Sequence, residues 1–133
     1  MSPSSRVKTI LAALALCAAL PGCAPMIQTT PANIEPVQSS VGARAVWLKD
    51  TTRIKLDTGY TRLVPSGKWV PVGHLSQGTV YRPVGTVFTI AARQVHEAYL
   101  VVHDRTLVGF YLPGESSYTP LNNAVPLTLG EIE

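Results

Sequence analysis

The chain has 133 residues, of which 11 are lysine or arginine and 8 are aspartate or glutamate, giving a formal net charge of +3. The basic residues are dispersed along the chain, whereas a nucleic-acid-binding surface needs clustered positive charge. The composition therefore argues against nucleic acid as a partner. The length is sufficient for one domain of modest stability.

The N-terminal residues have the pattern of an export signal. Arg6 and Lys8 precede an apolar run over residues 10–20, which ends at Pro21-Gly22. A transmembrane helix needs about 20 apolar residues, so this run is too short to span a bilayer. A basic flank, a short apolar run and small residues before a cleavage point are typical of secretory signals. We therefore expect residues 1–22 to be removed.

The segment Leu20-Pro21-Gly22-Cys23 resembles the lipobox of bacterial lipoproteins, although Pro21 stands where that family usually has Ala, Ser, Thr or Val. The resemblance implies cleavage between Gly22 and Cys23, a diacylglyceryl thioether on Cys23 and acylation of its new amino terminus. In Gram-negative lipoproteins, an aspartate directly after the cysteine tends to retain the protein in the inner membrane. This chain has Ala24 at that position. The resemblance thus favours a palmitate-bearing protein of the outer membrane.

An ordinary secretory cleavage is the alternative to lipidation. The nearest small-x-small triplet, Gly22-Cys23-Ala24, would leave Pro25 at the first mature position, which is a poor fit for that protease. In the lipoprotein interpretation, Cys17 leaves with the signal and Cys23 is modified. The mature domain then has no thiol for a disulfide, a zinc site or a nucleophile, and packing alone must hold the fold.

Residues 23–43 are predicted to be the lipidated cysteine and a flexible linker. Pro25, Pro31 and Pro36 lie among polar residues without apolar periodicity, which is typical of extended chain. Such a linker would hold the domain up to about 60 Å from the bilayer. The alternative is that part of the segment packs along the domain as an edge strand, anchored by Ile34 and Val37.

Residues 44–121 are predicted to form the β domain, largely because of their turns. Three loops end in glycine and suit a type I turn followed by a left-handed residue: Asp57-Thr58-Gly59, Pro65-Ser66-Gly67 and Pro83-Val84-Gly85. These loops predict three hairpins in a meander. In them Leu56 pairs with Tyr60, Leu63 with Trp69, and Tyr81 with Val87.

A fourth hairpin is expected between residues 97–102 and 107–112. In its predicted register Tyr99 faces Phe110, and Leu100 faces Gly109, which either makes room for Leu100 or marks a bulge. Both strands are apolar on both faces, which indicates that each face is covered. We expect this hairpin at the centre of a core that also contains Trp69 and Phe88.

The predicted fold class is all-β, a small antiparallel meander forming a barrel or sandwich of about six to eight short strands. Residues 90–95 are the only helical candidate, with one turn between two hairpins. Residues 122–133 form a C-terminal extension, in which residues 125–129 are a candidate for one added strand.

The sequence contains no recognisable catalytic or metal-binding constellation, so we predict a protein that is not an enzyme and has no metal or cofactor. His74, His96 and His103 lack metal-ligand spacing, and His96 and Glu97 are strand neighbours that point to opposite faces. Tyr118 and Glu115 are the predicted partner-contact residues, since they lie in a Ser/Pro/Gly-rich stretch. The alternative is that Tyr118 and Leu121 fold back to plug one end of the barrel.

These features together predict an outer-membrane lipoprotein, anchored through Cys23, with a small β domain that binds a protein partner or has a structural role in the cell envelope. An accessory role in a surface, secretion or conjugation apparatus is the favoured setting. The alternative is an inhibitor, immunity or exclusion lipoprotein acting against an incoming enzyme, toxin or phage. A ligand-carrying barrel is the third hypothesis, for which the chain is short, since about eight strands are needed to enclose one small ligand.

Overall fold

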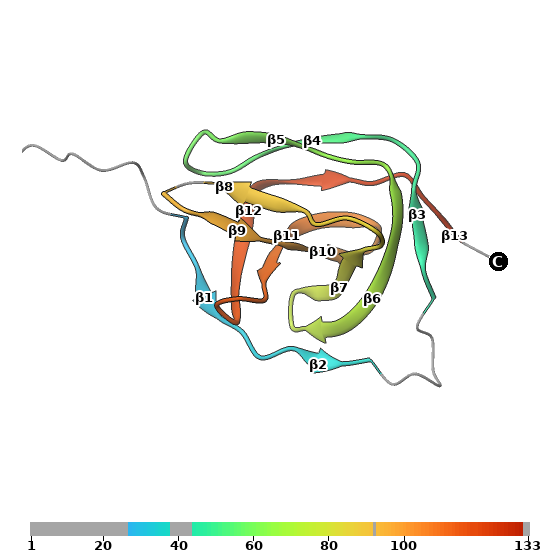
Figure 1. Ribbon diagram of the computed structural model, residues 1–133, viewed down its shortest axis with the longest axis horizontal. Helices are drawn as coiled ribbons and strands as arrows, with labels where there is room; N and C mark the ends of the chain where they lie inside the picture. Colours follow the sequence, from blue (N-terminus) through green and yellow to red (C-terminus); the bar gives the residue numbers. More distant parts are fainter. Residues whose placement is uncertain (1–26, 38–43, 92, 132–133) are drawn as a thin grey trace, which may run out of the picture.

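The computed structural model describes residues 27–37, 44–91 and 93–131, and the regular structure of these residues is antiparallel β-sheet (Figure 1). The predicted all-β class is confirmed. The described residues form 13 strands, more than the six to eight expected, because several strands have only two or three residues and because Thr30–Pro31, Glu35–Pro36 and Leu129–Glu131 also join the sheet. The signal, Gly22, Cys23 and Ala24 lie outside the described residues.

One large sheet contains nine of the strands. Their bounds are β1 Thr30–Pro31, β2 Glu35–Pro36, β3 Val46–Leu48, β6 Gly67–Leu75, β7 Gly78–Pro83, β10 Tyr99–His103, β11 Thr106–Leu112, β12 Ser117–Pro126 and β13 Leu129–Glu131. The strand order is β1-β12-β11-β10-β7-β6-β3-β13, with β2 paired to β6. Among the described strands, β1 and β13 end this path without pairing to each other, so the sheet is open.

Two further hairpins lie across the curved sheet. They are β4 (Thr52–Lys55) with β5 (Thr61–Val64), and β8 (Thr89–Ala91) with β9 (Val95–Glu97) (Figure 1). Ile54 of β4 and Ile90 of β8 are buried in the same cluster as sheet residues such as Leu100. The main core therefore lies between the large sheet and these two hairpins, in the manner of a sandwich.

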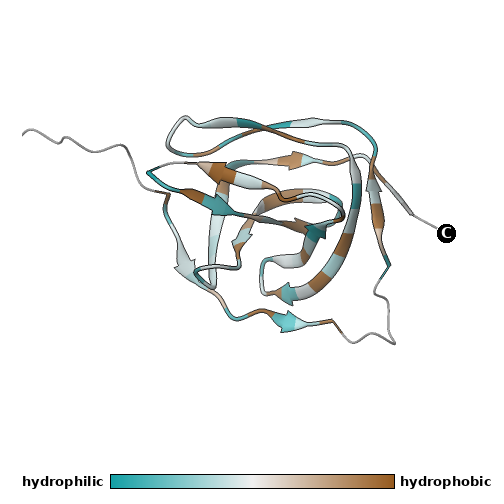
Figure 2. Cartoon of the chain, viewed as in Figure 1, coloured by the Kyte–Doolittle hydropathy of each residue, from teal (hydrophilic) through white to brown (hydrophobic). Residues whose placement is uncertain are grey.

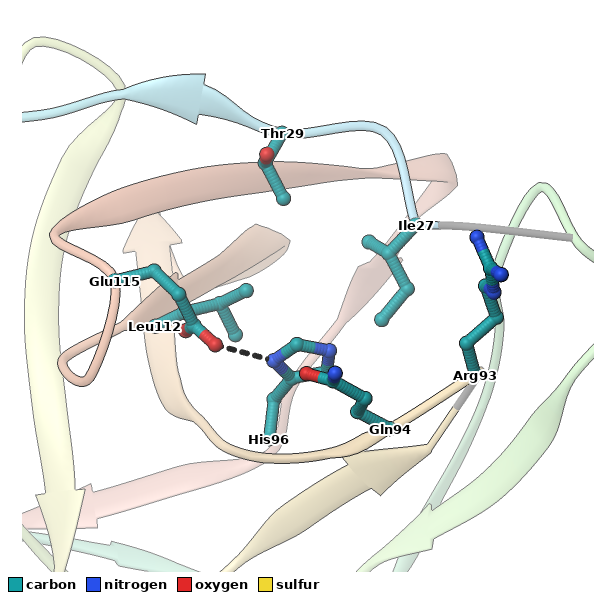
Figure 3. A pocket seen from close by; sticks show the side chains of 7 residues that line it. All are labelled: Ile27, Thr29, Arg93, Gln94, His96, Leu112 and Glu115. Atoms are coloured by element: carbon teal, nitrogen blue, oxygen red, sulfur yellow. Dashed lines mark hydrogen bonds and ion pairs between the residues drawn. The ribbon is translucent and has the colours of Figure 1, made fainter.

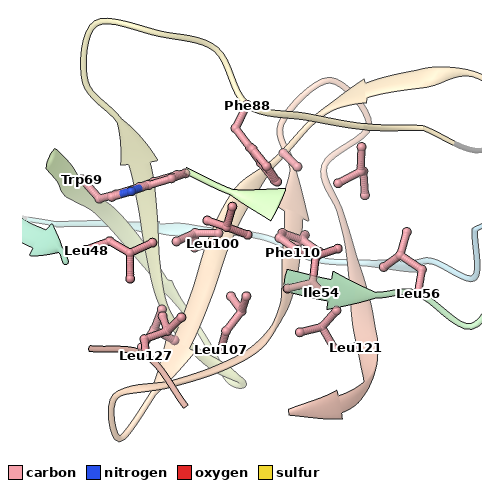
Figure 4. Close-up of a cluster of buried hydrophobic side chains, with 14 of the residues drawn as sticks. Leu48, Ile54, Leu56, Trp69, Phe88, Leu100, Leu107, Phe110, Leu121 and Leu127 are labelled. Atoms are coloured by element: carbon pink, nitrogen blue, oxygen red, sulfur yellow. The ribbon is translucent and has the colours of Figure 1, made fainter. Parts of the chain in front are cut away.

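The core contains three of the four aromatic residues predicted for it. Trp69, Phe88 and Phe110 are buried, with ring centroids 6.1 Å apart for Trp69–Phe88 and 5.8 Å apart for Phe88–Phe110 (Figure 4). Tyr99 is instead half-buried on the opposite face of the sheet, where it packs near Tyr111. The prediction for Tyr99 was wrong because the register of its strand differs by one residue from the expected one.

The four predicted hairpins had different outcomes. In the first, the Leu56 amide donates to the Tyr60 carbonyl at 2.9 Å and Gly59 has φ +88°, as predicted. The second and third were wrong, since Trp69 pairs with Val46 of β3, and Tyr81 pairs with Leu100 of β10 and Pro71 of β6. A glycine turn specifies a local reversal of the chain, and burial decides which strand lies alongside.

The fourth hairpin, β10 with β11, is present with a bulge. Next to the turn, Val102 pairs with Leu107, but beyond the bulge Leu100 pairs with Phe110 and Val101 with Gly109. Gly109 makes room for β12 rather than for Leu100, because a Cβ there would lie 2.5 Å from the Thr119 carbonyl oxygen. The expected covering of both faces is confirmed, since Phe110 lies in the main core and Tyr111 in a second cluster.

The second cluster is covered by residues 27–37, which we call the N-terminal strap. Strap strand β1 pairs with β12 and β2 pairs with β6, while the Ala32 amide donates to the Ser116 carbonyl at 2.9 Å. Ile34 packs against the second cluster directly above Gly73. The strap is therefore part of the folded domain, as in the edge-strand alternative, and the extended-linker prediction does not hold for these residues.

Two other segments differ from their predictions, the helical candidate at residues 90–95 and the candidate strand at residues 125–129. Residues 89–91 and 95–97 form the β8–β9 hairpin, with Ala91 paired to Val95, where a helical turn was the candidate. The C-terminal extension does add a strand, but β13 begins at Leu129 and pairs with β3, whereas residues 125 and 126 of the predicted 125–129 strand belong to β12. Figure 2 shows apolar residues in β8, and Ile90 of this strand is buried in the main core, which explains why this segment packs as a hairpin against the core.

Candidate binding pocket

One end of the domain has a pocket of about 390 Å³ between the strap, the β8–β9 hairpin and the turn that joins β11 to β12 (Figure 3). Its volume is at the small end of the range for ligand pockets. Five polar or charged and two apolar side chains form its walls: Ile27, Thr29, Arg93, Gln94, His96, Leu112 and Glu115.

The central feature of this pocket is a hydrogen bond between His96 and Glu115. The imidazole Nδ1 and the carboxylate Oε1 are 2.6 Å apart, and the two residues are separated by 19 positions in the sequence. His96 extends from β9, whereas Glu115 lies in the β11–β12 turn, where its amide donates to the Leu112 carbonyl at 3.2 Å. The bond thus joins the β8–β9 hairpin to the main sheet.

The pocket offers hydrogen-bonding groups that can hold a ligand. The bond to Glu115 occupies Nδ1 and leaves Nε2 of His96 for a ligand, but Thr29 supplies the one hydroxyl among the pocket walls. Nucleophilic catalysis requires a nucleophile held by the base, and no hydrogen bond of this kind is found at His96 among the described residues. In the same part of the chain, no group of three His, Cys, Asp or Glu residues is placed to hold a metal ion.

The two residues predicted to contact a partner occupy different environments. Glu115 is exposed and lines the pocket, whereas Tyr118 is only 7% exposed and donates its hydroxyl to the Val108 carbonyl at 3.2 Å. Burial raises the pKa of the Tyr118 hydroxyl. A buried position does not suit a contact role. Tyr118 and Leu121 are both buried, but they lie within strand β12 of the large sheet rather than folding back to plug the end of a barrel.

The sequence contained little signal for the rest of the pocket. Arg93 and Gln94 lie in the segment that was the helical candidate, and Ile27 and Thr29 lie in the expected linker. His96 was considered only beside Glu97, while its actual partner comes from another hairpin. Contact between segments so far apart depends on the strand order, which local patterns do not specify.

A second exposed feature, which we call the Trp47 row, consists of Trp47, Lys68 and Val84. Trp47 of β3 is 48% exposed and lies directly opposite Lys68 of β6, and the Val84 amide donates to the Lys68 carbonyl at 3.1 Å. Figure 1 places β3 on the opposite side of the molecule from β1, so this row is remote from the pocket. An exposed tryptophan on the face of a sheet is typical of a contact surface.

No family model, no curated protein and no solved structure matches this chain. In the part of the chain that the structure describes, no helix has the length and apolar character needed to cross a bilayer. The site must therefore be interpreted from its own geometry.

Proposed function

We propose that this protein is a lipid-anchored component of the cell envelope, with the outer membrane as its favoured location and a small β domain that binds another envelope protein. The observation that carries the proposal is Cys23 at the end of Leu20-Pro21-Gly22-Cys23, after a basic and apolar leader. The role is one of binding rather than catalysis, since the pocket pairs His96 with Glu115 and, among the residues that the structure describes, no nucleophile is hydrogen-bonded to His96.

The protein-binding part of the proposal is supported by the Trp47 row. Tryptophan is enriched among the few interface residues that contribute most of the binding free energy. Trp47 lies on a regular strand, so its backbone is held by the β3–β6 ladder, and a tryptophan side chain has only two χ angles to fix on binding. An exposed tryptophan on a rigid strand is the surface of this domain best suited to a protein partner.

The anchor is tested by labelling cells with a palmitate analogue and fractionating their membranes. Wild-type protein is expected to take the label and to sediment with the outer membrane, and Cys23→Ser to lose both properties. Cys17→Ser is the matched control, because Cys17 lies within the leader and its loss leaves the lipidated residue in place. An unlabelled, soluble wild-type protein would contradict the proposal.

The partner surface is tested by photocross-linking in intact cells. A photoreactive side chain at Lys68 is expected to form a discrete adduct with an envelope protein, and Trp47→Ala is expected to weaken it by about tenfold or more, as for a central interface residue. Leu63→Ala is the control, since Leu63 is also half-exposed but lies on β5, outside this row. An adduct that is unaffected by Trp47→Ala, or equally weakened by both changes, would contradict a role for the row.

A further inference from the structure

The position of the strap limits how far the domain can lie from its lipid anchor. Ile27 lines the pocket and is four residues after Cys23. A residue of extended chain spans at most about 3.6 Å, so the Cα atoms of Cys23 and Ile27 lie within about 14 Å of each other. This inference rests on the proposed lipidation of Cys23. If Cys23 is lipidated, the pocket is held at the level of the phospholipid headgroups.

The side chains at this end of the domain suit a membrane surface. Figure 3 shows Arg93, at the end of the β8–β9 hairpin, beside Ile27. Val95, two residues further along, is 71% exposed, the largest exposure among the large apolar side chains described. Asp57, in the β4–β5 turn, borders a second, smaller hollow beside Ile27. This end of the domain thus includes a cation, an exposed apolar side chain and a carboxylate.

The pocket itself combines groups of opposite charge. Arg93 lies on one side and the Glu115 carboxylate on the other, with His96 and Gln94 between them (Figure 3). A guanidinium binds phosphate through charge-assisted hydrogen bonds, and a carboxylate accepts hydrogen bonds from an ammonium group. Ile27 and Leu112 offer an apolar wall for the methylene groups between such charges. A ligand with a phosphate and a primary ammonium would match both sides.

We propose that the pocket binds the headgroup of a phosphatidylethanolamine molecule in the membrane that holds Cys23, with Arg93 at the phosphate and Glu115 at the ammonium. The lipid is the source of the phosphate because the tether keeps the pocket at the bilayer surface. Binding fixes the orientation of the domain, with the β8–β9 hairpin at the membrane. The Trp47 row, on the opposite side of the molecule, then faces away from the bilayer toward a protein partner.

The test measures the depth of two sites in the full lipidated chain. Val95→Cys and Val84→Cys each provide one thiol for a fluorophore, since Cys17 leaves with the signal and Cys23 is modified. Each labelled protein is reconstituted into phosphatidylethanolamine vesicles that contain a lipid with a nitroxide on its headgroup. Strong quenching at position 95 and weak quenching at position 84 are expected. Equal quenching at both positions, or stronger quenching at 84, would overturn the proposal.

A second pair of comparisons separates the headgroup site from the effect of the tether alone. Quenching at position 95 is expected to fall when a neutral galactolipid, which has no phosphate, replaces phosphatidylethanolamine. Arg93→Gln should cause the same loss in phosphatidylethanolamine vesicles, and Arg93→Lys should preserve the signal because it keeps the positive charge. Quenching that is independent of the lipid and of Arg93 would overturn the headgroup site.

The palmitate label, measured on the same preparations, distinguishes the two ways of failing. A labelled protein without differential quenching refutes the headgroup site and leaves the proposed anchor standing. An unlabelled protein refutes the anchor, and the headgroup site with it.

Discussion

Replacing Phe88 with alanine is expected to lower the free energy of unfolding by about 3–5 kcal/mol, the usual cost of deleting a buried aromatic side chain. Phe88 is 1% exposed and contacts the rings of Trp69 and Phe110. The Arg62 guanidinium also lies 4.8 Å from the Phe88 ring centroid, so the substitution removes a cation–π contact as well. The Phe88 ring, directly before β8, thus contacts both the main sheet and the β4–β5 hairpin.

This loss would be a large fraction of the total free energy of unfolding, because domains of this size are typically stable by about 5–15 kcal/mol. The measurement is urea unfolding of the mature chain followed by circular dichroism. Val87→Ala is the matched control, since Val87 is the preceding residue and is 64% exposed. It is expected to change the unfolding free energy by less than about 0.5 kcal/mol. Similar losses in the two variants would show that Phe88 is not a central core residue.

Gly73→Ala is expected to displace the N-terminal strap and to destabilise the domain by about 1–3 kcal/mol through overpacking. A Cβ at Gly73 would collide with the Ile34 side chain and would lie 2.6 Å from the Glu35 carbonyl oxygen. The Ile34 side chain can rotate, but the Glu35 carbonyl belongs to strand β2, which pairs with β6 at this point. The two strands must therefore separate to admit the methyl group.

The displacement is measured by limited proteolysis with mass mapping of the fragments. Gly73→Ala is expected to speed cleavage within residues 27–37, whereas wild-type protein should be protected there. Gly114→Ala is the control, because a Cβ at Gly114 meets no atom within 4 Å. If Gly73→Ala left the cleavage rate unchanged, the close packing of Ile34 on Gly73 would be contradicted. A lifted strap would also loosen the pocket, since Ile27 and Thr29 are among its walls.

The elements that the sequence predicted best are those specified by neighbouring residues. The Asp57-Thr58-Gly59 turn formed with Gly59 at positive φ, and the β10–β11 hairpin formed around Asp104-Arg105, where both residues have positive φ. A short loop of this kind brings its own flanking strands together at little entropic cost. Both hairpins could therefore be predicted without knowledge of the rest of the chain.

The elements that were missed depend on distant partners. Pro65-Ser66-Gly67 has the same turn chemistry as the first hairpin, yet Gly67 pairs with Leu48 and not with β5. Trp69, two residues further, is thereby buried in the main core. The free energy gained by burying a large aromatic side chain exceeds that of a local strand pair, so tertiary packing overrode the turn signal.

In the candidate site, too, single residues could be picked out from the sequence, but the contacts between them could not. Glu115 was predicted as a contact residue because of its Ser/Pro/Gly-rich segment, but its hydrogen bond to His96 required β9 to lie beside the β11–β12 turn. The strand character of the domain and its local turns could be predicted from the sequence, because they follow from the preferences of neighbouring residues. The strand order, the docking of the strap and the pocket required the folded structure, because each depends on burying apolar surface contributed by segments far apart in the chain.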